Sequence, residues 1–343
     1  MPHKFLGFAA AAVALCFFSP VQATAQQWKA PRTPDGKPDL QGFWSNNSAT
    51  PLQRPAELAG RTSLTNEEVV AMRKKAAELF DGRGDAAFGD NVFQTVLTAI
   101  KESTTGPHKR KVTDADGTGD YSSEWILPRD WDNRTSLITD PPDGRLPAMT
   151  AQAQARRPVV GAVRRTPEDM ETLPLQERCV HYGSPQLTAG YQSYYQVVQT
   201  PGSVMVMTEM IHDARIIPLD GRSHVPSSVR QWHGDSVGHW EGDTLVVDTV
   251  NYKARSFMST SSEKLHVVER FTRTEAEVLQ YQITIDDPDT WTKPWTLMVP
   301  LRRTSNPVLE YACHEGNSAM TGIMAGARAQ ERAAALTGSP EQK

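Results

Sequence analysis

Apolar and polar residues alternate along most of the second half of the chain. From about Tyr191 onward, short runs with a period of two are separated by turn sequences such as Pro201-Gly202 and Asp220-Gly221. This period sends successive side chains to opposite faces of a strand, so the pattern predicts an antiparallel sheet. The runs are Tyr194–Gln199, Ser203–Ile211, Arg215–Leu219, Val229–His233, Gly238–Trp240, Thr244–Asn251, His266–Arg273, Val278–Asp286, Thr296–Arg303 and Leu309–His314, preceded by Ser136–Thr139.

The predicted fold class is mainly β. We expect an antiparallel meander of about eight strands that forms a lipocalin-like, closed or nearly closed barrel, because eight strands can close around a small ligand. An open sandwich is the alternative. The expected organisation is a signal peptide over 1–25, an N-terminal arm with helices over 26–130, a ligand-binding β domain over 131–325 and a disordered or helical tail over 326–343.

The N-terminal arm is rich in turn residues and carries one clear helix signal. Thr65 and Glu68 form a capping-box pattern, with Leu64 and Val69 placed as a hydrophobic staple, which predicts a helix from about Asn66 to Phe80. A second helix is expected over Asn91–Lys101. Before these helices, residues 26–60 are expected to lie across the domain as an extended arm, anchored by Leu40, Phe43 and Trp44.

The first 25 residues resemble a cleavable export signal. A short basic start at His3 and Lys4 precedes an apolar run over 5–18, and Ala23-Thr24-Ala25 gives the small-x-small pattern of a cleavage site. The run is shorter than the roughly 20 residues that span a bilayer. We therefore expect cleavage of the signal peptide near Ala25, no stable membrane span, and a periplasmic or secreted mature protein.

The charge, the cysteines and the absence of known motifs limit the functions that this protein could have. Charged residues make up 22% of the 343 residues and the formal net charge is −4, which disfavours a nucleic-acid binder with a basic face. Beyond the signal, only Cys179 and Cys313 remain, and two cysteines in an oxidising compartment predict one disulfide. Two buried free thiols are the alternative. Patterns for a nucleophile elbow, a phosphate loop, a dinucleotide fingerprint or a haem attachment site do not occur.

Candidate catalytic residues cluster after the second expected strand. Alternation places Glu209 on the face of Met205 and Met207, and a carboxyl group on an apolar face has a raised pKa suited to acid–base chemistry. His212 and Arg215 follow, as a proton carrier and an anion-binding group. A surface turn with an Asp213–Arg215 ion pair is the alternative.

Further histidines complete the candidate set. We expect Glu209 or His212 to act as the general base and His314 or His224 to act as the general acid. Together with Glu315, the histidines at 212, 224 and 314 could converge on a metal ion, but their spacing matches no compact ligand signature. The sequence therefore predicts neither a metal nor another cofactor.

Apolar-face and aromatic residues are the candidates for substrate binding. Glu269 alternates with Leu265, Val267 and Phe271, and either contacts a substrate or pairs with an arginine of a neighbouring strand. Aromatic rings that could stack on a ligand are Trp232, Trp240, Tyr281 and Trp295, for which core packing is the alternative.

Three stretches carry a resemblance to a known group. They are residues 32–42 (RTPDGKPDLQG), 230–250 (RQWHGDSVGHWEGDTLVVDTV) and 310–317 (EYACHEGN). The chain resembles a large, mostly uncharacterised group of exported bacterial β-rich proteins. The resemblance covers most of the mature chain and implies export and a β-rich fold, and relatives in bacteria that degrade lignin-derived aromatic dimers suggest aromatic substrates.

The sequence thus predicts an exported, cofactor-independent enzyme. It would carry out acid–base chemistry of the lyase or isomerase type, such as ether-opening elimination, on a small aromatic or apolar molecule, with Arg215 steadying a developing oxyanion. A non-catalytic, lipocalin-like carrier of small molecules is the first alternative. An interaction module of the cell envelope is the second.

Overall fold

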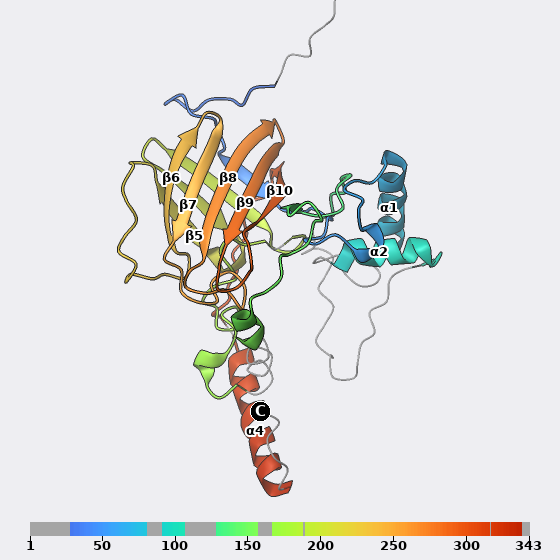
Figure 1. Ribbon diagram of the computed structural model, residues 1–343, viewed down its shortest axis with the longest axis vertical. Helices are drawn as coiled ribbons and strands as arrows, with labels where there is room; N and C mark the ends of the chain where they lie inside the picture. The colour runs from blue at the N-terminus through green and yellow to red at the C-terminus, as the bar shows by residue number, and fades with distance from the viewer. Residues whose placement is uncertain are drawn as a thin grey trace, which may run out of the picture.

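A ten-stranded antiparallel sheet dominates the computed structural model (Figure 1). The structure describes residues 28–80, 91–106, 128–156, 167–187, 189–315 and 317–337, so the expected signal segment 1–25 lies outside the described residues. The strands are β1 (Gly42–Ser45), β2 (Ile138–Asp140), β3 (Tyr194–Thr200), β4 (Ser203–Thr208), β5 (Ala214–Pro218), β6 (Asp235–Glu241), β7 (Thr244–Val250), β8 (His266–Glu275), β9 (Val278–Asp286) and β10 (Trp295–Thr304). The prediction of a mainly β, antiparallel protein is confirmed.

Two meanders make up the sheet, and the N-terminal arm joins them. The strand order is β5-β4-β3-β1-β10-β9-β8-β7-β6, with β2 pairing alongside β10. The arm therefore does more than lie across the domain, because β1 is a full member of the sheet between β3 and β10. Trp44 of β1 is fully buried, which anchors this junction in the core.

The sheet curls until its two edge strands meet, but hydrogen bonds do not close it. Strands β5 and β6 approach each other without pairing. Gly238 of β6 makes this approach possible, since a Cβ atom at this position would lie 2.8 Å from Cγ2 of Ile217 in β5. A residue without a side chain is thus needed where the edges touch.

Side chains fill the concave face of the curled sheet. Alternate residues of each strand are buried there, including Val204 and Val206, Val267 and Phe271, Leu279 and Ile283, and Leu297 and Val299. The same face holds the carboxylate of Glu269 and the guanidinium of Arg215. Among the described residues, the space inside the sheet is therefore lined by packed apolar side chains around the buried pair of Arg215 and Glu269.

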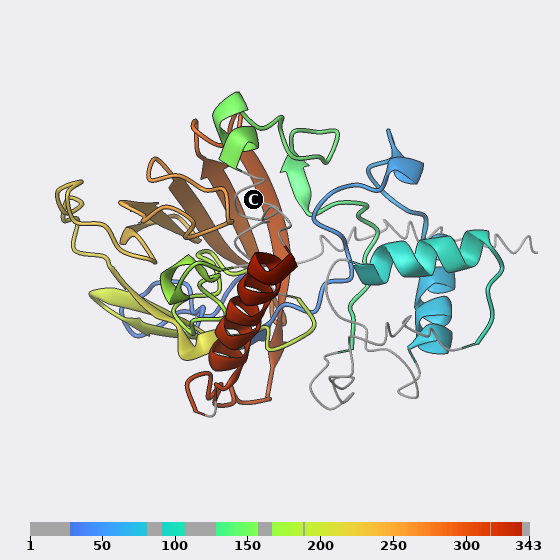
Figure 2. The ribbon, with the colours of Figure 1, turned by 90° about the horizontal axis from the view of Figure 1, so that it is seen from below.

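Several of the described helices lie outside the sheet. The predicted capping box is present: Thr65 accepts from the backbone N–H of Glu68 and begins α1 (Asn66–Leu79), which packs with α2 (Asn91–Lys101) in a second apolar core. Helix α4 (Ala319–Thr337) projects from one end of the sheet, the end seen in Figure 2. Among the described residues, no helix combines the length and the apolar character needed to cross a bilayer.

Three of the expected strands differ from the structure. Strand β4 ends at Thr208, and a short 3-10 helix (η4, Met210–His212) follows in place of strand residues 209–211. Residues 229–233 and 309–314 form connections without strand pairing beyond an isolated bridge at Gln231. Alternation in these stretches is too short to outweigh the turns on either side, so the apolar residues there remain at the surface.

Candidate functional site

A pocket of about 710 Å³ lies at one end of the curled sheet. Its walls come from the connections after β2, before β3, between β7 and β8, and between β9 and β10. The lining residues used below are Glu177, His181, Arg255, Phe257, Met258 and Trp291. A volume of this size is typical of sites for small organic molecules, which range over roughly 300–1,000 Å³.

One wall of the pocket is aromatic. Phe257 and Trp291 both line it, with their ring centroids 6.5 Å apart. Trp295 lies behind them, fully buried, at 5.6 Å from Trp291 and 6.2 Å from Phe257. Because Trp295 holds both rings from behind, the pocket offers a preformed apolar surface to a flat or aliphatic ligand.

Arg255 adds a positive charge to this pocket. Its backbone has φ +71°, a left-handed conformation that is uncommon for a residue with a side chain. None of the described residues hydrogen-bonds or ion-pairs with its guanidinium group, and its buried Nε has no partner. A buried arginine nitrogen without an acceptor indicates a place for an anionic or strongly accepting group of a ligand.

Three ionisable side chains converge at the edge of the same pocket. Nδ1 of His181 lies 3.4 Å from one carboxylate oxygen of Asp213, and Nε2 of His233 lies 3.2 Å from the other. The two imidazole rings meet edge to face, with centroids 4.5 Å apart. His181 is buried, whereas Asp213 and His233 are only partly covered. We call this group the His–Asp–His cluster.

Unusual backbone conformations position the cluster. Asp213 follows Ile211 and His212, which have φ values of +62° and +55°. Positive φ is rare for a β-branched residue and costs of order 1–3 kcal/mol, so the surrounding contacts must enforce it. His233 precedes Gly234, which has φ +66° and would place a Cβ atom 2.6 Å from a backbone carbonyl of β7. Glycine is therefore required beside His233.

Hydrogen bonds determine the protonation of the cluster. Nε2 of His181 lies 2.7 Å from the backbone carbonyl oxygen of Ser256, which can only accept, so Nε2 carries the proton. The contact is to the carbonyl and not to the hydroxyl, so it does not activate Ser256 as a nucleophile. Burial by itself would raise the pKa of Asp213, but hydrogen bonds from His181 and His233 outweigh it and lower the pKa on balance. Asp213 is thus an anion at neutral pH.

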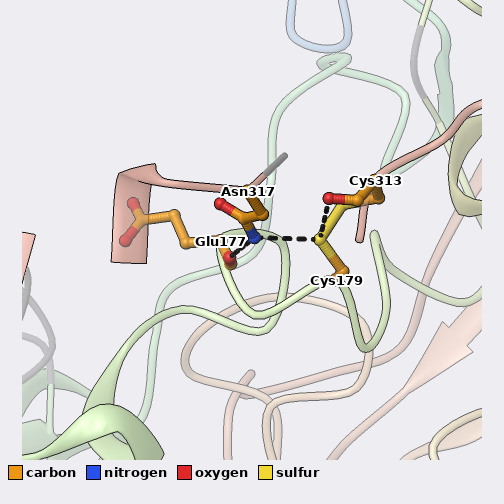
Figure 3. The surroundings of a disulfide bond; sticks show 4 residues. All are labelled: Glu177, Cys179, Cys313 and Asn317. Carbon is orange, nitrogen blue, oxygen red and sulfur yellow. Dashed lines mark hydrogen bonds between the residues drawn. A yellow bond between two sulfur atoms is a disulfide. The ribbon is translucent and has the colours of Figure 1, made fainter. Parts of the chain in front are cut away.

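The predicted disulfide joins Cys179, two residues before His181, to Cys313 (Figure 3). It ties the segment that follows β10 to the loop that carries His181. Nδ2 of Asn317 donates to the backbone oxygen of Glu177 and contacts Sγ of Cys179, so the same loop is held a second time. The disulfide thereby holds the loop of His181, which among the described residues is the one member of the cluster that also lines the pocket.

The predicted catalytic residues Glu209 and His212 hold this same C-terminal segment. Glu209 accepts a hydrogen bond from the backbone N–H of Leu309, and Nε2 of His212 accepts one from that of Tyr311. The expected alternation does not hold, because β4 ends before Glu209 and the face of Met205 and Met207 points away from the core. Burial does raise the pKa of Glu209, as expected. Neither residue lines the pocket.

The other three predicted catalytic residues lie apart from one another. Arg215 is inside the sheet, where it binds Glu269. His224 lies outside the concave face between two carboxylates, Asp235 at 2.8 Å and Asp248 at 2.9 Å. His314 is exposed in a turn. The structure thus separates Arg215, inside the sheet, and His224, outside it, from Glu209 and His212, which contact the segment after β10.

The buried pair of Arg215 and Glu269 crosses the concave face. Its two N–O distances are 2.6 and 2.7 Å, and the hydroxyl of Tyr281 donates to the same carboxylate. Burial opposes the charge of Arg215, but the attraction of Glu269 outweighs it and raises the pKa of Arg215. Of the two readings of Glu269, pairing with an arginine is correct, although the arginine comes from across the interior and not from a neighbouring strand.

The aromatic residues predicted to bind a substrate do not line the pocket. Tyr281 is buried in the core, and Trp295 lies behind the pocket wall. Trp232 carries the ammonium group of Lys253 over its ring at 4.8 Å. Trp240 packs against the main core from β6. None of the four, nor Glu269, lines the pocket.

Sequence reasoning missed His181, Asp213 and His233 as a unit. The three come from segments separated by at least 20 positions, and no compact spacing joins them. Two local signals existed: His233 stands before a Gly-Asp turn, and His181 stands two residues after a cysteine expected to be bridged.

Comparisons with known proteins add little to this geometry. No protein-family model and no curated protein match the chain. Among solved structures, a mutant of the fluorescent protein UnaG is similar, at 13% sequence identity and a TM-score of 0.21, over 33% of this chain and 72% of that chain. A similarity this slight carries no argument about ligand or activity.

Proposed function

We propose that the chain is an enzyme that binds a small molecule with an aromatic or apolar body and an acidic group at the end of a lipocalin-like barrel. The single observation that supports this is the pocket itself. An aromatic wall, an unpaired arginine and His181 line one pocket of about 710 Å³, and His181 contacts the carboxylate of Asp213 behind it. Apolar walls with a few convergent polar groups are the usual composition of ligand sites.

The proposed chemistry is proton transfer, now placed at the His–Asp–His cluster. Asp213 is ionised, and each histidine presents a ring nitrogen to it, so the cluster can take a proton from a substrate and return one. Arg255 would bind the acidic group of the substrate and stabilise negative charge that develops nearby. The reaction class remains that of a lyase or isomerase.

Export to the periplasm is part of the proposal. The signal-like pattern of the first 25 residues supports it, as does the resemblance to exported β-rich proteins. The disulfide between Cys179 and Cys313 supports it independently, since such bonds persist in oxidising compartments.

A panel of aromatic acids, ethers and esters tests the proposal by two measurements. Quenching of tryptophan fluorescence reports binding beside Trp291, and chromatography of the incubated compounds reports turnover. We expect Arg255→Gln to weaken binding of the acids at least tenfold, and Asp213→Asn to lower kcat by about a hundredfold or more, within the range of general acid–base contributions.

Matched controls come from outside the pocket. Arg222→Gln removes an exposed arginine that pairs with Asp220, and His224→Gln removes a histidine from the other carboxylate group. Both should leave binding and turnover unchanged. Binding without turnover would favour the carrier, which the preformed aromatic wall also suits. The absence of both, or equal losses in the controls, would refute the proposal.

A further inference from the structure

We propose that His181, Asp213 and His233 bind one divalent transition-metal ion. The inference departs from the expectation of a metal-free protein. The proposed metal site borders the pocket of the proposed function, because His181 belongs to both. Only the role of the ion in a reaction rests on the proposed function, and binding of the ion is tested without a substrate.

The lone pair of His181 points toward the carboxylate of Asp213. Since Nε2 of His181 donates its proton to the carbonyl of Ser256, the neutral ring has its lone pair on Nδ1. That nitrogen faces the carboxylate of Asp213, which also has only lone pairs to offer. Two acceptors face each other comfortably only when a cation lies between them, either a proton on Nδ1 of His181 or a metal ion. A backbone carbonyl that fixes the free nitrogen of a histidine is also the usual outer partner of a metal ligand.

The distances within the His–Asp–His cluster are also those of metal ligands. The contacts of Asp213 with His181 and His233 are 3.4 and 3.2 Å. A charge-assisted hydrogen bond would be shorter, at about 2.7–2.9 Å. Ligands held 2.0–2.1 Å from a tetrahedral zinc ion lie roughly 3.3–3.4 Å from each other. One ligand atom from each of the three side chains lies within 4.8 Å of the other two, which makes the cluster a candidate for holding one ion.

A second histidine–carboxylate group in the chain shows the contrast. His224 has Nδ1 at 2.8 Å from Asp235 and Nε2 at 2.9 Å from Asp248, and His266 lies 2.9 Å from Asp248. These are the lengths of charge-assisted hydrogen bonds. Both nitrogens of His224 are occupied by carboxylates, so it has no lone pair left for an ion. The distances in the His–Asp–His cluster therefore suit a metal ion better than those around His224 do.

The ligand set indicates the class of metal and its use. Two imidazoles and one carboxylate suit zinc, cobalt, nickel or ferrous iron better than magnesium or calcium. Three protein ligands leave a coordination position open, which is the pattern of catalytic and not of structural sites. Because His181 lines the pocket, the open position borders the space where a substrate would bind. An ion there would lower the pKa of a bound water or polarise a substrate oxygen.

Calorimetric titration with zinc chloride tests the proposal. The sample is the whole mature chain that follows the expected signal peptide, without an affinity tag and after dialysis against a chelator. We expect one equivalent of Zn²⁺ to bind. Asp213→Asn and His233→Gln should each weaken binding at least about a hundredfold, more than the loss of an outer partner does. The matched controls His224→Gln and His266→Gln should keep one equivalent at unchanged affinity. Absence of stoichiometric binding to the wild type, or equal loss in the controls, would overturn the proposal.

A crystallographic measurement on the wild-type protein tests the same site without relying on variants that could fail to fold. Anomalous scattering at the zinc edge from wild-type crystals should give one peak between the three side chains, and a peak at His224 would contradict the assignment. Failure of the two proposals can be told apart. Zinc binding without turnover of any panel compound would support the metal site and refute the proposed enzyme, whereas turnover by a protein that binds no zinc would support the enzyme and refute the metal site.

Discussion

Replacing Glu269 with Gln would leave the guanidinium of Arg215 without a counter-charge inside the curled sheet. The side chain of Glu269 is fully buried and that of Arg215 is 10% exposed, and two short N–O contacts join them. Breaking a buried pair from one side costs about 3–5 kcal/mol, because the remaining charge stays out of water. Typical domains are stable by only about 5–15 kcal/mol, so Glu269→Gln would remove a large fraction of the free energy of unfolding.

Replacing both partners should cost much less. In the double variant Arg215→Met/Glu269→Leu, apolar side chains replace the two charges, a change that is often neutral or stabilising. The hydroxyl of Tyr281 then loses its acceptor, at about 1–3 kcal/mol, and Tyr281→Phe added to the pair removes that loss. We expect the double variant to lose no more than about 2 kcal/mol and the triple variant to lie closer to the wild type.

Urea unfolding at pH 7, followed by circular dichroism, measures these differences. Equal slopes across the variants would show that the same surface is exposed on unfolding in each. A loss below about 1 kcal/mol for Glu269→Gln would mean that water reaches Arg215. A double variant that loses as much as the two single variants together would mean that the pair is not coupled. Either result would refute the description of the concave face as a dry core.

Three further predictions concern the cluster, the sheet edges and the second histidine group. Gly234→Ala should destabilise the protein by about 2–3 kcal/mol in urea, because a Cβ atom meets backbone at a positive φ; a neutral result would mean that the turn beside the cluster can shift. Gly238→Val should cost about 1–3 kcal/mol by forcing β6 away from Ile217, and an unchanged free energy of unfolding would show that the edges do not touch. The hydrogen bond from Asp248 raises the pKa of His266, so His266 stabilises the folded protein at pH values below its unfolded pKa and stops doing so as pH rises through the folded one. Asp248→Asn should return that pKa toward 6.5 in an NMR titration, and an unmoved pKa would assign the shift to another cause.

Local chemistry explains why most elements could be predicted. The capping box of Thr65 and Glu68 begins α1 where expected, since it needs only residues three apart. The alternation in β7, β8 and β9 reflects burial of one face of a strand, which each run records by itself. The disulfide followed from the count of cysteines and the expected compartment.

Long-range placement explains the rest. Insertion of β1 between β3 and β10 depends on pairing across more than 150 residues, which no local pattern records. The end of β4 is set by positive φ at Ile211, a conformation that its β-branched side chain disfavours. If that turn is ignored, the alternation extends through Glu209, which is why the sequence predicts a candidate base there. The cluster then forms from loops that meet only in the folded sheet.

The position of a bound ligand tests the central claim most directly. Crystals of the wild-type protein soaked with the tightest-binding aromatic acid of the panel would locate it by diffraction. The account predicts density against Phe257 and Trp291, with the acidic group within hydrogen-bonding distance of the guanidinium of Arg255. Density inside the concave face, or beside Glu209 and away from this pocket, would contradict it.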